Sequence, residues 1–195
     1  MATLADMVNE VIVLTGRPDL TARIEQAVRA ATIKAHSVDF FDRDLVERPI
    51  QWTTPAYIQS LPYKQIFPRF RAIKYIRKYA NSVPGAFFKD VLPELTQDSY
   101  GVDLLDIYYL AGANLELRSS TMDNYMLIGA YEYPDTSAAG YSSWIADSFS
   151  PLIYTEAASA IHRSTGNKEQ VALLQNDLAQ LYTELRTNFL PTVGV

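Results

Sequence analysis

The last part of the chain carries a narrow apolar seam that constrains the fold more than any other sequence feature. Within residues 168–188, five aliphatic side chains recur at alternating spacings of three and four: Val171, Leu174, Leu178, Leu181 and Leu185. This spacing predicts a helix of roughly 32 Å with one apolar stripe. Burying such a side chain contributes about 1.5–3 kcal/mol only if a partner surface covers it. We therefore expect these five residues to form the core of a helix bundle.

Capping residues indicate where this helix begins and what precedes it. Asn167 is a candidate cap, Gln170 occupies the reciprocal position of a capping box, and Gly166 can end a preceding helix. That preceding helix is expected to have Ser150 as its cap and Pro151 as its first residue. The short turn between the two helices predicts an antiparallel hairpin. Pairing of the seam between two chains, as a coiled coil, stays open as an alternative.

The first residues predict a second helical hairpin. One helix is expected from about Leu4 to Leu14, with Thr3 as its cap and Gly16 at its end, and another begins at Asp19. Each hairpin has one apolar face. Two such hairpins can cover each other as a small bundle.

Between the hairpins, prolines separate runs rich in aromatic and branched residues, which are typical of strands. Strands are predicted at 46–52, 57–61, 71–77, 105–110, 114–118 and 125–133. Ala111 and Gly112 indicate a tight hairpin. The apolar spacing within residues 71–79 would also suit a helix.

The chain has 195 residues, of which 48% are hydrophobic, a size that favours one core over two. We expect a single domain, 1–195, of class α+β. Residues 1–45 and 141–190 would form the helical bundle from N-terminal and C-terminal hairpins. Residues 46–140 would form an inserted, antiparallel β-rich middle.

Composition narrows the function classes. The chain has no cysteine, which excludes a disulfide framework, a thiol nucleophile and a cysteine zinc site. Neither a signal peptide nor a membrane span is expected, because no basic start precedes an apolar run and no apolar run is long enough. A net charge of −5 argues against general affinity for nucleic-acid phosphates.

Charge is distributed unevenly along the middle of the chain. Eight basic and no acidic residues lie between Arg48 and Lys89, whereas nine acidic residues accompany Arg118 alone between Asp90 and Asp135. The two stretches could neutralise each other across strands of one sheet. Alternatively, each forms a face that meets the opposite sign on a neighbouring subunit, as in a head-to-tail ring. Candidate interface residues are then Arg69, Arg71, Lys74, Arg77, Lys78, Asp103, Asp106 and Glu132.

The sequence contains no phosphate-binding loop and no common hydrolase motif. His36 and His162 lie near predicted helix C-termini, where an imidazolium is favoured by the helix dipole; a His-based catalytic dyad is the alternative. Asp103 and Asp106 could serve as an acid–base pair.

Two further stretches have both a chemical and a structural interpretation. Four carboxylates, Asp39, Asp42, Asp44 and Glu47, could bind Mg²⁺ or Ca²⁺, or they are solvated caps and turn residues. The run PRFRAIKYIRKYA interleaves bases and aromatics, as single-strand nucleic-acid platforms do. An amphipathic strand with basic stems packed over apolar surface is the preferred interpretation of that run.

Several local patterns together resemble one family of structural proteins. These patterns are H-x-x-x-FF-x-RD, then FPRFRAIKYIR, then IYYLAGANLELRS followed by YEYP, and finally SWI before SPLIYTEAASAI. With the helical hairpins, they resemble adaptor proteins of the head-to-tail connector of tailed bacteriophages. The resemblance spans nearly the whole chain and consists of layout and local patterns.

The resemblance implies a virion protein without catalytic residues or cofactors. It would form a homo-oligomeric ring matching the twelvefold symmetry of the portal, in the phage neck, after assembly in the host cytoplasm. Its partners would be the portal and other neck or tail proteins, and genome DNA would pass through the ring without specific binding. One alternative is a small metal-dependent hydrolase or nuclease using the carboxylates from Asp39 to Glu47. A weaker alternative is a tail completion or terminator protein.

Overall fold

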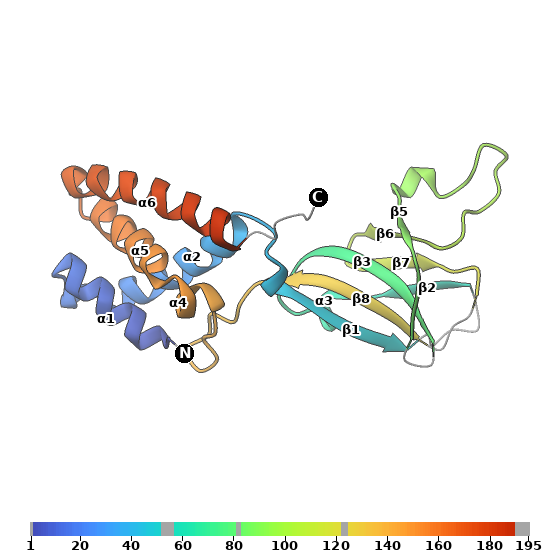
Figure 1. Ribbon diagram of the computed structural model, residues 1–195, viewed down its shortest axis with the longest axis horizontal. Helices are drawn as coiled ribbons and strands as arrows, with labels where there is room; N and C mark the ends of the chain where they lie inside the picture. The colour runs from blue at the N-terminus through green and yellow to red at the C-terminus, as the bar shows by residue number, and fades with distance from the viewer. Residues whose placement is uncertain (1, 52–56, 81–82, 122–124, 190–195) are drawn as a thin grey trace. The chain divides into compact units, whose positions relative to one another are not determined.

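The computed structural model describes residues 2–51, 57–80, 83–121 and 125–189. The chain forms two compact units: unit 1 comprises residues 1–44 and 133–195, and unit 2 comprises residues 45–132. Unit 1 is helical and unit 2 contains two sheets (Figure 1). The predicted α+β class, with a β-rich insertion between N- and C-terminal helices, is confirmed. Each unit has a hydrophobic core of its own, so the insertion is a separate packing unit and not an excursion from one shared core.

Unit 1 is built around one helix. Its helices are α1 (Leu4–Thr15), α2 (Thr21–Ser37), α4 (Trp144–Ser148), α5 (Ser150–Ser164) and α6 (Lys168–Phe189), with 3-10 turns at Pro18–Leu20 and Asp42–Asp44. Helix α5 contacts α1, α2 and α6, and eight of its residues are buried. Alanines at 157 and 158 let neighbouring helices approach it closely. The prediction that the two hairpins cover each other is therefore confirmed.

Three helix boundaries in unit 1 follow the predicted capping residues: the start of α1, its end, and the turn between α5 and α6. Thr3 Oγ1 accepts a hydrogen bond from the Asp6 N–H at 3.1 Å, and Asp6 Oδ2 accepts one from the Thr3 N–H at 2.9 Å. Gly16 and Gly166 have φ of 63° and 78°, in the left-handed region that favours glycine. Asn167 Oδ1 accepts from the Gln170 N–H at 3.3 Å. These ends were readable because capping depends on local chemistry.

Two predicted helix starts were wrong. Asp19 lies in the 3-10 turn Pro18–Leu20, and α2 begins at Thr21. Ser150 is the first residue of α5, and Phe149 occupies the capping position. The serine that caps lies earlier, where Ser143 Oγ accepts from the Ala146 N–H at 3.2 Å at the start of the short helix α4. The turn that α4 adds before α5 was not predicted.

Helix α6 buries its seam unevenly. Leu178 and Leu185 are buried, and Leu174 and Leu181 are partly buried against the core. Val171 is half-exposed and lines a surface pocket. The predicted core residues are therefore buried in the C-terminal part of the seam, and their burial decreases towards its N-terminal start at Val171.

Unit 2 contains eight strands in the described residues: β1 (Leu45–Gln51), β2 (Ile58–Leu61), β3 (Phe70–Ala80), β4 (Val83–Phe87), β5 (Lys89–Asp90), β6 (Ile107–Ala111), β7 (Asn114–Arg118) and β8 (Tyr125–Glu132). They form two sheets, ordered β1-β8-β3-β4 and β2-β7-β6-β5. The strand pairs are antiparallel apart from the short β5–β6 pair. A short helix, α3 (Tyr63–Ile66), follows β2. Buried side chains from both sheets, including Ile76, Ile128, Leu115 and Leu117, share one core.

Each of the six predicted strands corresponds to an observed strand, with ends that differ by at most three residues; predicted position Trp52 lies outside the described residues. The alternative of a helix at 71–79 is wrong, because β3 pairs along this length with β8. Gly112, with φ of 60°, forms the predicted turn between β6 and β7. No helix in the described ranges is long and apolar enough to cross a membrane.

Candidate functional site

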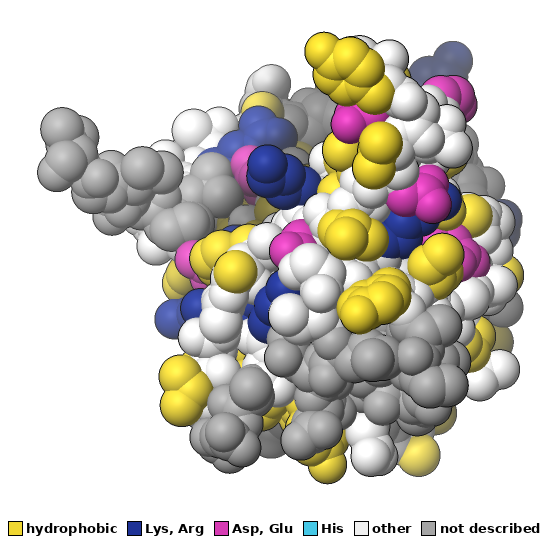
Figure 2. All heavy atoms as spheres, turned by 90° about the vertical axis from the view of Figure 1, so that its right-hand side faces the viewer, with side chains coloured by type: hydrophobic (Ala, Val, Ile, Leu, Met, Phe, Trp, Pro, Cys, Tyr) yellow, Lys and Arg dark blue, Asp and Glu magenta, His cyan; other side chains and the backbone are white. Residues whose placement is uncertain are grey.

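The strongest candidate contact surface of unit 2 is a long excursion between β5 and β6. We call residues 91–105 the apical loop; it includes a 3-10 turn at Pro93–Leu95. Its exposed large hydrophobic side chains are Leu92, Leu95, Tyr100, Val102 and Leu105. Tyr100 is 92% exposed. Figure 2 shows hydrophobic side chains standing on this face of unit 2, with acidic side chains between them. A cluster of this kind is typical of a protein contact surface.

Hydrogen bonds hold the tip of the apical loop in one conformation. Asp98 Oδ1 accepts from the backbone N–H groups of Tyr100, at 2.8 Å, and Val102, at 2.9 Å. The Asp98 N–H donates to the Val102 carbonyl at 2.9 Å, and Gly101 takes the left-handed backbone with φ of 77°. Because this turn is already ordered, binding through Tyr100 would lose little backbone entropy.

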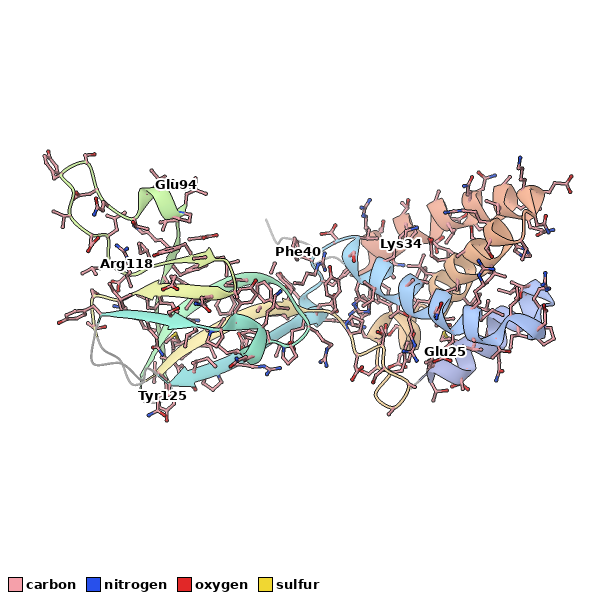
Figure 3. The ribbon with its side chains drawn as sticks, turned by 180° about the vertical axis from the view of Figure 1, so that it is seen from behind. Glu25, Lys34, Phe40, Glu94, Arg118 and Tyr125 are labelled. Atoms are coloured by element: carbon pink, nitrogen blue, oxygen red, sulfur yellow. The ribbon has the colours of Figure 1, made fainter. Side chains whose placement is uncertain are left out.

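Arg118 anchors the apical loop to the sheet beneath it. Its Nη1 donates to Asp103 Oδ1 at 2.8 Å and to the Thr96 carbonyl at 3.4 Å, and its side chain is only 16% exposed. Figure 3 shows the loop, with Glu94 labelled, rising from the sheet that carries Arg118. Arg118, the lone base in the acidic stretch, therefore positions the loop.

Lys78 and Asp106, both predicted at a subunit interface, pair within unit 2. Lys78 Nζ lies 2.8 Å from Asp106 Oδ1, and the same oxygen accepts from the Ser120 N–H at 2.8 Å. Partial burial raises the pKa of Asp106, but hydrogen bonds from Lys78 and Ser120 outweigh burial and leave that pKa below its ordinary value. The pair links the end of β3 to the chain just before β6, and so joins the two sheets.

Other predicted interface acids are also paired internally. The Glu132 side chain is only 3% exposed, 3.2 Å from Arg48 and 4.0 Å from Arg69. A carboxylate so deeply buried has no surface to offer a neighbouring subunit, so we remove Glu132 from the candidate interface. With Asp103 held by Arg118 and Asp106 by its lysine, neutralisation within the unit accounts for these three acids.

The remaining predicted interface bases lie on β3. The Lys74 ammonium lies 5.6 Å from the centre of the Tyr131 ring, and the Arg77 guanidinium lies 4.6 Å from that of Phe87. Arg71 is half-buried on the same strand. Basic groups over aromatic rings fit the interpretation of this run as an amphipathic strand.

The four carboxylates of the proposed metal site are not brought together as a ligand group. Asp39 lies 3.9 Å from Arg186, Asp42 is exposed, and Asp44 is buried in unit 1. Glu47 lies on β1 of unit 2. Over the described ranges, no group of three or more His, Cys, Asp or Glu side chains is arranged to hold a metal ion.

Asp44 instead joins a buried polar network in unit 1. Its Oδ1 lies 2.8 Å from His36 Nδ1 and accepts from Trp144 Nε1 at 2.7 Å. The other imidazole nitrogen, Nε2, lies 2.9 Å from Ser143 Oγ. These residue types match a serine nucleophile triad, but His36 is 1% and Ser143 5% exposed. The serine already caps α4, so the network fastens α2, the turn before β1 and α4 to one another.

The two histidines lie where the sequence predicted. His36 is in the last turn of α2 and His162 in the last turn of α5. His36 sits in the buried network, whereas His162 is half-buried and its carbonyl accepts from the Asn167 N–H at 3.0 Å in the turn to α6.

Unit 1 carries a small pocket at the turn between α5 and α6. Its volume is about 240 Å³, and it is lined by Arg163, Gly166, Lys168, Val171, Ala172 and Gln175. We call it the turn pocket. Val171 belongs to the apolar seam of α6. The pocket therefore lies at the end of the seam that α5 does not fully bury.

The turn pocket was not predicted as a contact surface. The apical loop was predicted only in part: Asp103 was a candidate interface residue, and the tyrosine-containing run YGVDLLDIYYL, which begins at Tyr100, suits a protein interface by its composition. The available signal was the run VLPELTQDSYGVDLL, which has several large apolar residues without strand or helix periodicity and no basic residue. A run without strand or helix periodicity indicates a loop, and large apolar residues in a surface loop are candidates for a contact surface.

The sequence matches no protein-family model, and no curated protein matches it significantly.

Proposed function

We propose that this chain is a structural adaptor subunit of a tailed-bacteriophage head-to-tail connector, forming a ring on the portal through which the genome passes. The observation that carries the proposal is the apical loop, residues 91–105. It displays large apolar side chains on a backbone that hydrogen bonds have already ordered. An apolar surface on a fixed support serves contact with another protein.

The sequence patterns that resemble connector adaptors support the same proposal. They fall on distinct parts of the structure: the end of α2 with the following turn, strand β3, the β6–β7 hairpin, and α4 with α5. The resemblance therefore covers both units and not one shared local motif.

Charge is compatible with DNA passing through such a ring. Each copy carries a net charge of −5, and a ring multiplies that charge by the number of copies. An acidic lumen repels the phosphate backbone, so DNA would slide through without forming stable contacts.

The test is assembly on the portal. The purified chain is mixed with the portal protein encoded in the same genome, and the mass of any complex is measured by native mass spectrometry, with imaging of its symmetry. We expect a stoichiometric ring with one copy per portal subunit. A chain that stays unbound at micromolar concentration contradicts the proposal, and binding to the end of a tail tube instead would favour a tail terminator.

A further inference from the structure

The tip of the apical loop and the turn pocket are complementary in charge. The loop contains no basic residue, and Glu94 and Asp98 supply its negative charge, since Asp103 is paired with Arg118 of the sheet beneath. The pocket lining contains two exposed cations, Arg163 and Lys168, and no acid. Surfaces of opposite sign attract each other and fix which partner binds.

The tip and the pocket are also complementary in size and polarity. Tyr100 projects from the loop almost fully exposed, while Val171 and Ala172 give the pocket an apolar wall. A cavity of about 150 Å³ is large enough to hold benzene, so the turn pocket, at about 240 Å³, has room for a phenol ring. A tyrosine suits such a site because its ring buries apolar area and its hydroxyl can stay hydrated at the rim.

We propose that the apical loop of one copy docks into the turn pocket of a neighbouring copy, with the Tyr100 ring inserted between Arg163 and Lys168. This inference rests on the proposed ring assembly and names the contact that builds it. The two surfaces are different parts of the chain, so the contact is head-to-tail and can repeat from copy to copy until a ring closes. The Tyr100 side chain, once inserted in the pocket, would be a central anchor of the interface, as buried tyrosines often are.

The experiment uses two variants that each remove one half of the contact. Tyr100→Ser removes the inserted ring, and Ala172→Glu places a negative charge in the pocket that the acidic loop must enter. Both positions are exposed, so each variant should fold as the wild type does, which circular dichroism and thermal melting verify. Each variant alone should lose rings by native mass spectrometry under conditions where the wild type forms them.

Mixing the two variants gives the decisive measurement. The intact loop of Ala172→Glu can dock into the intact pocket of Tyr100→Ser. The two surfaces that remain, the altered loop and the altered pocket, can bind no further copy. We expect mixed pairs of one copy each and no larger assembly. Matched controls are Tyr57→Ser, at a half-exposed tyrosine elsewhere on unit 2, and Leu173→Glu, beside the pocket but outside its lining. Both controls should assemble normally.

A third variant maps the contact directly and retains an aromatic ring. A photo-cross-linking benzoylphenylalanine replaces Tyr100, and isotopically labelled and unlabelled copies are mixed before irradiation. We expect links between copies, to peptides that contain residues 163–175. Links to other peptides, or links confined within one copy, overturn the inference.

The outcomes separate this inference from the proposed function. If Tyr100→Ser and Ala172→Glu still form rings on the portal, the docking contact is wrong and the adaptor function stands. If the wild type forms no ring with or without the portal, the adaptor function fails and the docking contact fails with it.

Discussion

The aromatic ring of Tyr75 lies directly over Gly129 on the neighbouring strand of unit 2. A Cβ placed on Gly129 would fall 2.7 Å from Tyr75 Cζ and 2.9 Å from Cε1. The two residues are register partners between β3 and β8. The glycine is therefore required by the ring that covers it and not by an unusual backbone angle.

Gly129→Ala should destabilise unit 2 by about 1–3 kcal/mol, because the new methyl group must displace a packed ring. Urea unfolding followed by circular dichroism measures the change. In the background Tyr75→Leu, the same substitution should cost markedly less, which a double-mutant cycle reports as coupling. Equal costs in the two backgrounds would show that the ring is not the cause.

Asp44→Ala should destabilise unit 1 by on the order of 3 kcal/mol, because His36 and Trp144 lose the buried oxygen that both contact. Thermal unfolding provides the measurement. Asp42→Ala, two residues away at an exposed position, is the control and should have a much smaller effect. Similar losses in both variants would remove the network as the explanation.

Leu185→Ala should cost about 2–5 kcal/mol, as expected for a fully buried leucine in a packed core. Val171→Ala should cost less than about 1 kcal/mol, since Val171 is half-exposed at the turn pocket. The free energies of unfolding of the two variants, compared with wild type, check this gradient along α6. A seam buried evenly from end to end would instead give comparable losses.

Stability should fall at alkaline pH. Burial, aided by the charge of Asp90, raises the pKa of Tyr108 to about 12. An unfolded tyrosine ionises near pH 10, so between pH 10 and 12 the unfolded chain releases a proton that the folded chain retains. The stabilisation is complete below pH 10 and is lost as pH rises, by on the order of 2 kcal/mol at pH 12. Tyr108→Phe should reduce this loss in urea titrations at pH 9 and 11; an unchanged loss would assign it to other groups.

Lys78→Gln should raise the pKa of Asp106, because it replaces the ammonium group that stabilises the carboxylate. In the wild type, the lowered pKa gives stability that is present above the ordinary aspartate value and is lost as pH falls through the folded-state pKa. The variant should show a smaller loss of stability in acid. NMR titration of the Asp106 carboxyl measures the pKa directly, and a value unchanged by the substitution contradicts the assigned role.

Elements defined by nearby residues could be predicted from the sequence. Thr3, Gly16 and Asn167 act at helix ends through contacts within a few residues, so their roles are visible in the sequence itself. The six predicted strands likewise follow from local composition and punctuation.

Features that depend on distant partners could not be predicted. Strand β5 is only two residues long and exists because it pairs with β6, across the whole apical loop. The partners of Asp44 lie in two other elements, and no residue near Asp44 in the sequence indicates that Trp144 donates a hydrogen bond to it. The same limit applies to the candidate interface. The charge pattern along the sequence suggested a partner in another subunit for Glu132, whereas the burial of Glu132 beside Arg48 depends on the pairing of β1 with β8.

The first and last strands of unit 2 are register partners, which places the two ends of the insertion next to each other. β1 begins at Leu45 and β8 ends at Glu132, and Leu45 is paired with Tyr131, so the chain arrives and departs at neighbouring points of one sheet. A segment with adjoining ends and a hydrophobic core of its own can be removed, expressed alone or exchanged for another segment without changing the path of the chain in unit 1.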